Sequence, residues 1–322
     1  LVGAISALKL SGNTKTVPIS TEQPRAGATE EWVQSAKHVP RFYNTSDSPL
    51  DVDNIPSTVS TGSARYAVGV EYDGSRFHGW QSQSGVRTVQ DCIEKALSAV
   101  ASEAIRVVTA GRTDTGVHAT GQVCHFDSAA DRSSLNWLRG ANTHLPSGSA
   151  LTWIKEVDRT FHARFTALSR QYRYILFCRD VRPTYLSGKV TWTYEKLDVE
   201  RMKRAAALLQ GRHDFSAFRA SGCQSKQPVR EIYELSVNSE GPWIWIDIEA
   251  DGFLQHMVRN IAGVLTAVAN GSKPIPWVEE VLQSCDRSAG GVTALPDGLY
   301  FSGVRYPEVF RIPSPPEPCK FW

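Results

Sequence analysis

The 322-residue sequence lacks the cysteine pattern of a zinc site or of a disulfide framework. Its six cysteines are widely spaced, form no C-x-x-C pair and do not cluster with histidine. This spacing favours a reducing compartment, so we expect the protein to be cytoplasmic.

Long hydrophobic runs and phosphate-binding loops are also missing. No apolar stretch approaches the roughly 20 residues that span a bilayer, so no membrane association is expected. Neither G-x-x-x-x-G-K-[ST] nor G-x-G-x-x-G occurs, so no nucleotide cofactor is implied. His118 and His125 flank a turn, but no cysteine or acidic cluster of ligand type lies near them in sequence, and a metal site is not expected.

The net charge of +2 averages over segments that differ strongly. Residues 159–230 contain fifteen Lys and Arg against five Asp and Glu, a local charge of +10, with aromatic residues interleaved. Such a segment suits a polyanion whose phosphates need cations and whose bases stack on rings. A solvated face with ordinary core aromatics explains the composition equally well.

The chain divides into four parts by composition and pattern. Residues 1–63 are rich in Ser, Thr, Pro and Asn with weak periodicity, and they are predicted to be a flexible extension. Residues 64–165 and 166–307 are predicted to be two halves that each mix strands and helices. The remaining residues, 308–322, contain too many prolines for regular structure.

The patterned body mixes two periodicities. Alternating apolar residues predict strands, and apolar residues at helical spacing predict helices, two of them with the capping residues Thr88 and Asp198. Strands in runs with helices covering one face indicate an α+β fold with a mixed, largely antiparallel sheet and flanking helices. The predicted strands are 65–72, 104–110, 121–127, 171–177 and 243–250, and the predicted helices are 89–100, 198–209 and 253–270.

A single carboxylate stands out in the segment AGRTDTGVHATGQVCHFD, residues 110–127. Asp114 lies in a loop between two predicted strands, two residues after Arg112, and loops on a rigid sheet often carry catalytic groups. Arg259 is an outlier in the apolar helix predicted at 253–270. It needs a carboxylate partner such as Asp114 if it is buried, or it lies on the exposed side of that helix. Periodicity leaves both possibilities open.

Six segments, taken together and in order, resemble the bacterial tRNA pseudouridine synthase A (TruA) family, especially its gammaproteobacterial members. The resemblance covers about residues 65–307, and its longest uninterrupted segment is the one that contains Asp114. The six segments are YDGSRFHGWQ, AGRTDTGVHATGQVCHFD, FHARFTALSRQYRYILF, HDFSAFRA, FLQHMVRNIAGVL and DGLYFSGVRYP.

This resemblance implies the pseudouridine synthase fold, with two similar α+β halves around a central cleft. It also implies the isomerisation of uridine to pseudouridine without a cofactor. The target uridines would be those at about positions 38 to 40, in the anticodon arm of tRNA, and the enzyme would be a homodimer. The essential aspartate of the family corresponds to Asp114. It acts either as a nucleophile or as a base that removes the C2′ proton to give a glycal.

The resemblance also implies roles for individual residues. Arg112 helps to extrude the target nucleotide and fills its place in the stack, and Tyr172 stacks on the target base and is a candidate in the removal of the C5 proton. Arg259 pairs with the catalytic aspartate, and Leu299 belongs to the apolar wall of the uracil pocket. Four further arginines are expected to contact phosphates. They are Arg159, Arg164, Arg170 and Arg173.

Two residues depart from the family pattern. Thr115 stands where alanine is usual, and Phe301 replaces a common aliphatic residue. Both leave the catalytic groups in place, but they could alter turn packing or the shape of the pocket.

Two other classes of function compete with this interpretation. A non-catalytic RNA-binding protein on the same scaffold would be indicated by loss of Asp114, Tyr172 or Arg259, and all three are present. Metal-dependent hydrolysis of RNA would need clustered carboxylates, which the single acid of the loop does not supply.

Overall fold

The structure is a computed structural model and describes residues 62–322. The extension predicted for residues 1–63 therefore lies outside the described residues, except for its last two. The strands are β1 (Ala64–Tyr72), β2 (Val108–Thr109), β3 (His118–Ser128), β4 (Ser149–Val157), β5 (Ser169–Cys178), β6 (Thr191–Thr193), β7 (Gly211–Asp214), β8 (Val229–Glu240), β9 (Trp243–Ala250) and β10 (Leu299–Arg305). The α-helices are α1 (Val89–Ala101), α2 (Ser134–His144), α3 (Val199–Ala207), α4 (Met257–Ala269) and α5 (Trp277–Ser284).

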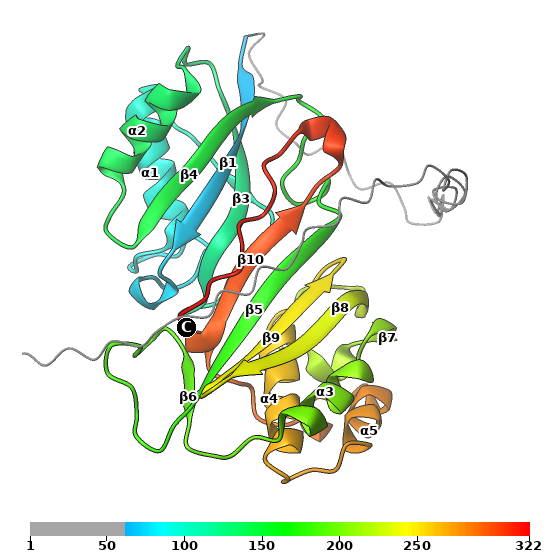
Figure 1. Cartoon of the computed structure of the whole chain (residues 1–322). Coiled ribbons are helices and arrows are strands. Elements are labelled where there is room, and N and C mark those ends of the chain that lie inside the picture. The colour runs from blue at the N-terminus through cyan, green and yellow to red at the C-terminus, as the bar shows by residue number, and fades with distance from the viewer. Residues whose placement is uncertain (1–61) are drawn as a thin grey trace, which may run out of the picture. The chain divides into compact units, whose positions relative to one another are not determined.

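All of these strands join one ten-stranded sheet in the order β4-β1-β3-β10-β5-β9-β8-β7, with β2 beside β3 and β6 beside β5 (Figure 1). Neighbouring strands are antiparallel except for the pairs β3–β10 and β5–β6, which are parallel. The mixed, largely antiparallel sheet of the predicted α+β fold is confirmed.

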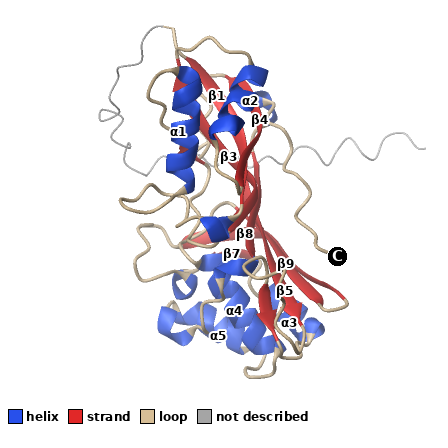
Figure 2. Cartoon of the chain, turned by 90° about the vertical axis from the view of Figure 1, so that its left-hand side faces the viewer, coloured by secondary structure: helices blue, strands red, loops and turns tan. Residues whose placement is uncertain are grey.

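The sheet has two groups of elements that meet at β10. In the first group α1 and α2 pack beside β4, β1 and β3, and in the second group α3, α4 and α5 accompany β5, β9, β8 and β7. Strand β10 comes from the end of the second group in sequence but lies between β3 and β5. Figure 2 shows the helices on one side of the sheet and the C-terminal segment on the other.

The predicted helix caps are confirmed. The Thr88 hydroxyl accepts a hydrogen bond from the Asp91 amide, and the Asp198 carboxylate accepts one from the Arg201 amide. Each bond satisfies an amide that has no partner within its own helix, so α1 and α3 begin at the positions that the sequence predicts.

The strand predicted at 104–110 is mostly wrong, because only Val108 and Thr109 pair with β3. Ile105 and Val107 are buried, as their apolar character suggests. The Val107 amide, however, donates to the side chain of Glu94 on α1 (3.1 Å) instead of to a neighbouring strand. A side-chain acceptor has replaced a sheet hydrogen bond here.

The helix predicted at 253–270 begins four residues late. His256 has a φ angle of 63°, in the left-handed region, so α4 starts at Met257 and ends at Ala269. Residues before His256 cannot continue the helix, because a left-handed residue reverses the backbone direction that the helix requires.

Residues after β10 contain one 3₁₀ turn, Glu308–Phe310, and no further helix or strand. The last residue of the sequence, Trp322, nevertheless packs on the rings of Trp243 and Trp245 in β9. Across residues 62–322, none of the helices is both long enough and apolar enough to cross a membrane.

The buried His125 of β3 makes the stability of this fold depend on pH. Burial and the nearby charge of Arg65 lower the pKa of His125 from 6.5 to about 3. Between pH 3 and pH 6.5 His125 is protonated in the unfolded chain but neutral in the folded protein. The free energy of unfolding therefore decreases as the pH falls from 6.5 towards 3. The contribution of one such group is at most about 1.4 kcal/mol per pH unit.

We therefore expect His125→Asn to flatten the dependence of the unfolding free energy on pH. Asparagine can still accept the hydrogen bond that the Ala163 amide donates to His125 Nδ1 (3.1 Å), but it does not titrate. The measurement is urea unfolding at several pH values between 4.5 and 7.5. His144→Asn, at an exposed position, is the matched control. If the unfolding free energy of His125→Asn depended on pH as steeply as that of the parent protein, His125 would not be the source of this dependence.

Candidate active site

A cleft of about 1350 Å³ lies over the central strands of the sheet. Its floor includes Tyr172 of β5 and Leu299 and Phe301 of β10. The loop before α1 and the loop between β2 and β3 form one side, and the segment between β9 and α4 forms the other. Side chains from both groups of elements therefore meet in one cleft.

The loop that carries Asp114 is fixed on both sides of the carboxylate. Thr113 is hydrogen-bonded through its hydroxyl to the Tyr72 hydroxyl (2.8 Å), and its carbonyl accepts from the Trp80 amide (3.0 Å). The Val117 amide donates to the Asp114 carbonyl (3.1 Å), and Gly116 has a φ of 83° that permits this tight turn. The position of the Asp114 side chain is thus determined by the backbone on each side of it.

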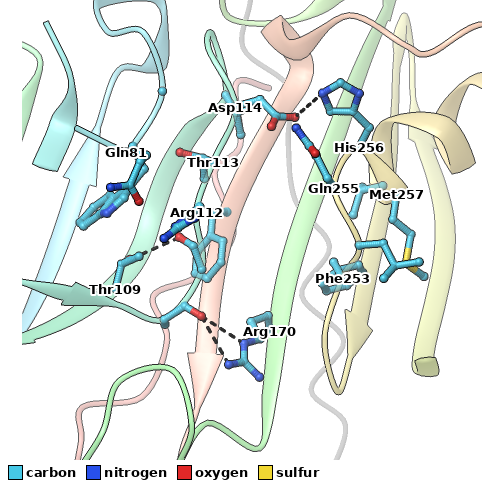
Figure 3. Close-up of a pocket in the computed structure, with 18 of the residues that line it drawn as sticks. Gln81, Thr109, Arg112, Thr113, Asp114, Arg170, Phe253, Gln255, His256 and Met257 are labelled. Atoms are coloured by element: carbon cyan, nitrogen blue, oxygen red, sulfur yellow. Dashed lines mark hydrogen bonds and ion pairs between the residues drawn. The ribbon is translucent and has the colours of Figure 1, made fainter. Parts of the chain in front are cut away.

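Two basic side chains contact the same oxygen of Asp114. Arg259 Nη1 and His256 Nε2 each lie 3.3 Å from Asp114 Oδ2 (Figure 3 shows the histidine contact). Arg259 is further fixed because its Nε donates to the Ala294 carbonyl (2.8 Å). Within residues 62–322, no hydrogen bond or ion pair reaches Asp114 Oδ1, and the side chain is 29% exposed in the cleft. The carboxylate is anchored through one oxygen and presents the other to the cleft.

His256 was not predicted as a site residue from the sequence. It stands in the segment FLQHMVRN, where apolar spacing places it inside a helix. In the structure its left-handed conformation puts it just before the first turn of α4, three residues from Arg259. Positive φ is uncommon for residues other than glycine, and the sequence pattern gives no signal for it here.

Tyr172 lies buried on the floor of the cleft between two aromatic rings. Its ring makes edge-to-face contacts with Phe253 and Phe301, each with centroids 4.9 Å apart. Burial raises the pKa of Tyr172 above its ordinary value of 10, so the phenol is neutral at physiological pH. Leu299 is 4% exposed and adds an apolar side chain beside it.

The two departures from the family pattern have different structural settings. Phe301 is fully buried under Gly111, where a Cβ atom would approach its ring to 2.8 Å, and it packs on Tyr172. The larger side chain therefore supports both the loop and the tyrosine. Thr115 is exposed on the loop, and nothing in the structure explains its identity.

The cleft is rich in arginine. Arg112, Arg164 and Arg170 all line it. Arg170 is half-buried and donates to the Asp251 carbonyl (2.8 Å) and to the Ala110 carbonyl (3.4 Å), the latter drawn in Figure 3. In all, five arginines and two aspartates line the cleft, which gives it an excess of positive charge. The five are Arg112, Arg164, Arg170, Arg230 and Arg259.

Arg159 and Arg173 do not line this cleft. Arg173 follows Tyr172 in β5 and therefore points to the opposite face, where it forms a two-bond ion pair with Asp247 (2.7 Å each) and donates to the Cys319 carbonyl. Arg159 donates to the Ser63 carbonyl. The local charge of +10 is therefore divided between the cleft and other surfaces.

No group of three or more metal-ligating side chains is present among residues 62–322. The cleft itself is lined by an anchored carboxylate, a neutral phenol, apolar side chains and arginines. This set suits a nucleophile or base acting on a flat, uncharged group that is carried on a polyanion.

Comparisons with known proteins place this chain in one family. The family model described as tRNA pseudouridine synthase matches residues 69–166 and 205–307. The curated tRNA pseudouridine synthase A of Nitrosococcus oceani is 54% identical over 258 residues, which is 80% of this chain and 100% of that protein. That of Pseudomonas aeruginosa is 48% identical, covering 80% of this chain and 90% of that protein.

Among solved structures, an H/ACA RNP bound to a substrate RNA containing 2′-deoxyuridine has a TM-score of 0.27 and 8% identity. The match covers 63% of this chain and 52% of that one. The family model covers more than half of the chain, and the curated relatives are about half identical along nearly their whole length. The chain therefore belongs to the tRNA pseudouridine synthase family.

Proposed function

We propose that this protein isomerises uridine to pseudouridine in the anticodon arm of tRNA, at about positions 38 to 40, with Asp114 as the catalytic carboxylate. The observation that carries the proposal is the anchoring of Asp114 through Oδ2 alone, with Oδ1 facing a cleft lined by Tyr172 and Leu299. An oxygen held in place and without a protein partner is available to react with the substrate.

The reaction is an internal rearrangement of one nucleotide. The bond between N1 of uracil and C1′ of the ribose breaks, the base turns, and a bond forms between C5 and C1′. The C5 proton then leaves and N1 takes up a proton, so the atoms and electrons balance without an external oxidant or reductant. Asp114 Oδ1 enters either as a nucleophile or as the base that removes the C2′ proton.

The remaining residues of the cleft hold the substrate for this rearrangement. The Tyr172 ring stacks on the target base, and Leu299 bounds the uracil pocket, so the turned base stays shielded from water. The raised pKa of Tyr172 keeps its phenol protonated. It can therefore remove the C5 proton only after its own proton has passed to another group.

The positive cleft takes the RNA backbone in this proposal. Arg164 and Arg170 are its phosphate contacts, and Arg112 occupies the place of the extruded uridine. We further propose that two copies of the chain form a homodimer that binds tRNA in the cytoplasm.

Replacement of Asp114 by asparagine tests the proposal directly. We expect Asp114→Asn to lower the rate by at least about 1,000-fold, because the amide is neither a nucleophile nor a base. The measurement is tritium release from tRNA labelled at uridine C5, without added metal or nucleotide, with the released label mapped to the modified position.

Binding of the same tRNA must be retained by Asp114→Asn for the comparison to be valid. Release by the parent protein alone supports the proposal. Tight binding by both proteins with release from neither would indicate a non-catalytic RNA-binding protein on this scaffold.

We infer that His256 positions Asp114, because it contacts the same oxygen as Arg259. Asparagine tolerates the left-handed backbone of residue 256 but is too short to keep the contact. We therefore expect His256→Asn to lower kcat by about 10- to 100-fold with little change in KM or in the melting temperature.

Partial recovery of kcat in His256→Gln, whose amide can donate to Oδ2, would distinguish positioning from a purely structural effect. A rise in KM at constant kcat would instead mean that His256 contacts the RNA.

The shape of the Arg112 side chain is expected to matter more than its charge. Arg112 is exposed in the cleft and makes no ion pair within the described residues. Lysine keeps the charge but lacks the planar group that stacks in place of a base. Since base extrusion costs a few kcal/mol, we expect Arg112→Lys to lower kcat/KM by about 10- to 100-fold.

The salt dependence of tRNA binding should stay unchanged in this variant, because the number of cations is the same. Arg182→Lys, at an exposed position outside the cleft, is the matched control. Full activity of Arg112→Lys would show that the positive charge of Arg112, and not its planar shape, is what the reaction needs.

A further inference from the structure

Phe165 is a large apolar side chain left exposed at the cleft. It is 68% exposed, it lines the cleft, and it lies in the segment between β4 and β5. Single exposed apolar side chains are common on proteins and need no special explanation. Hydrogen bonds and ring stacking, however, hold this ring in one position at the cleft.

The turn at residues 161–166 holds the Phe165 ring in place. His162 Nδ1 accepts hydrogen bonds from the amides of Arg164 (3.2 Å) and Phe165 (3.1 Å), and the Thr166 hydroxyl donates to the His162 carbonyl (2.7 Å). The Phe165 ring stacks on the imidazole with centroids 4.3 Å apart. Burial and the nearby Arg65 charge lower the pKa of His162, so the supporting imidazole is neutral at pH 7.

The turn is also tied to the catalytic loop. The Arg170 guanidinium donates to the Arg164 carbonyl in the turn and to the Ala110 carbonyl, four residues before Asp114. One half-buried side chain thus connects the turn that carries the Phe165 ring to the loop that carries Asp114. The Arg164 guanidinium lies over the same ring, 5.5 Å from its centroid, so a base that stacks there takes the place of this cation on the ring.

The cleft is larger than the target nucleotide needs. Pockets for single small molecules occupy roughly 300–1,000 Å³, and this cleft has about 1350 Å³. Its excess of arginine favours an anionic occupant over an apolar peptide. In RNA loops, unpaired bases bind to proteins chiefly by stacking on aromatic rings beside cations.

We propose that Phe165 is a stacking platform for an unpaired nucleobase that flanks the target uridine, with Arg164 binding the adjacent phosphate. This inference rests on the proposed function, since it takes the occupant of the cleft to be the anticodon arm. The platform binds one neighbouring base at a fixed distance from Asp114, while the uridine itself enters the pocket beside Tyr172.

The test uses the full-length Asp114→Asn protein, whose turnover is expected to be at least about 1,000-fold slower than that of the parent. Its tRNA carries 2-aminopurine at one unpaired anticodon-loop position at a time. Stacking on an aromatic ring quenches the fluorescence of this base. We expect quenching at one or more positions, loss of that quenching when Phe165→Leu is added, and retention when Phe165→Tyr is added. The dissociation constant should rise by about 5- to 100-fold for the leucine variant alone.

Tyr185→Leu, in a loop outside the cleft and 79% exposed, is the matched control and should change neither signal. Leucine keeps much of the apolar volume at an exposed position, so the fold should be unaffected. Unchanged quenching and a dissociation constant within about twofold in Phe165→Leu would overturn the proposal. Failure of Phe165→Tyr to retain the quenching would overturn it as well.

The proposed function and this platform can fail separately. Tritium release by the parent protein, with quenching unaffected by Phe165→Leu, refutes the platform and leaves the enzyme. No tritium release, with quenching that depends on Phe165, refutes the enzyme and leaves an RNA-binding cleft that contains the platform.

Discussion

The ion pair between Asp114 and Arg259 is the interaction on which the site depends. It joins the loop after β2, from the first group of elements, to α4 in the second group. The Arg259 side chain is only 15% exposed, so removal of its partner would leave a largely desolvated charge, which is costly. The two groups are thus connected by the sheet below the cleft and by this pair at the cleft itself.

The left-handed residue at the start of α4 determines how this pair is arranged. His256 reaches Asp114 because the backbone reverses there and not one turn earlier. A non-glycine residue in this conformation costs on the order of 1 kcal/mol, which the surrounding contacts must offset. As a result, His256 joins Arg259 at Asp114 Oδ2, while Oδ1 has no partner among the described residues. The φ angle of His256 is what brings this second basic group to Oδ2.

Local signals in the sequence predicted the fold well, and tertiary effects account for the differences. Capping by Thr88 and Asp198 depends on neighbouring residues alone and was predicted at the right positions. The late start of α4 and the loss of the strand near Val107 both depend on partners far away in sequence. The expectation of a phosphate contact at Arg173 does not say which face of β5 the side chain occupies. Strand alternation places it opposite Tyr172, away from the cleft. A count of charges along the chain does not contain that information.

The place of β10 has a consequence for biosynthesis. It is the last strand of the described chain to leave the ribosome, yet it lies at the centre of the sheet, pairing with β3 from about 180 residues earlier. During translation β1, β3 and β4 can pair with one another, and so can β5, β7, β8 and β9, but the two groups cannot join before β10 is made. The cleft floor at Leu299 and Phe301 is completed only when this strand inserts. A nascent chain therefore has no complete cleft until the strand at the end of the fold has been made.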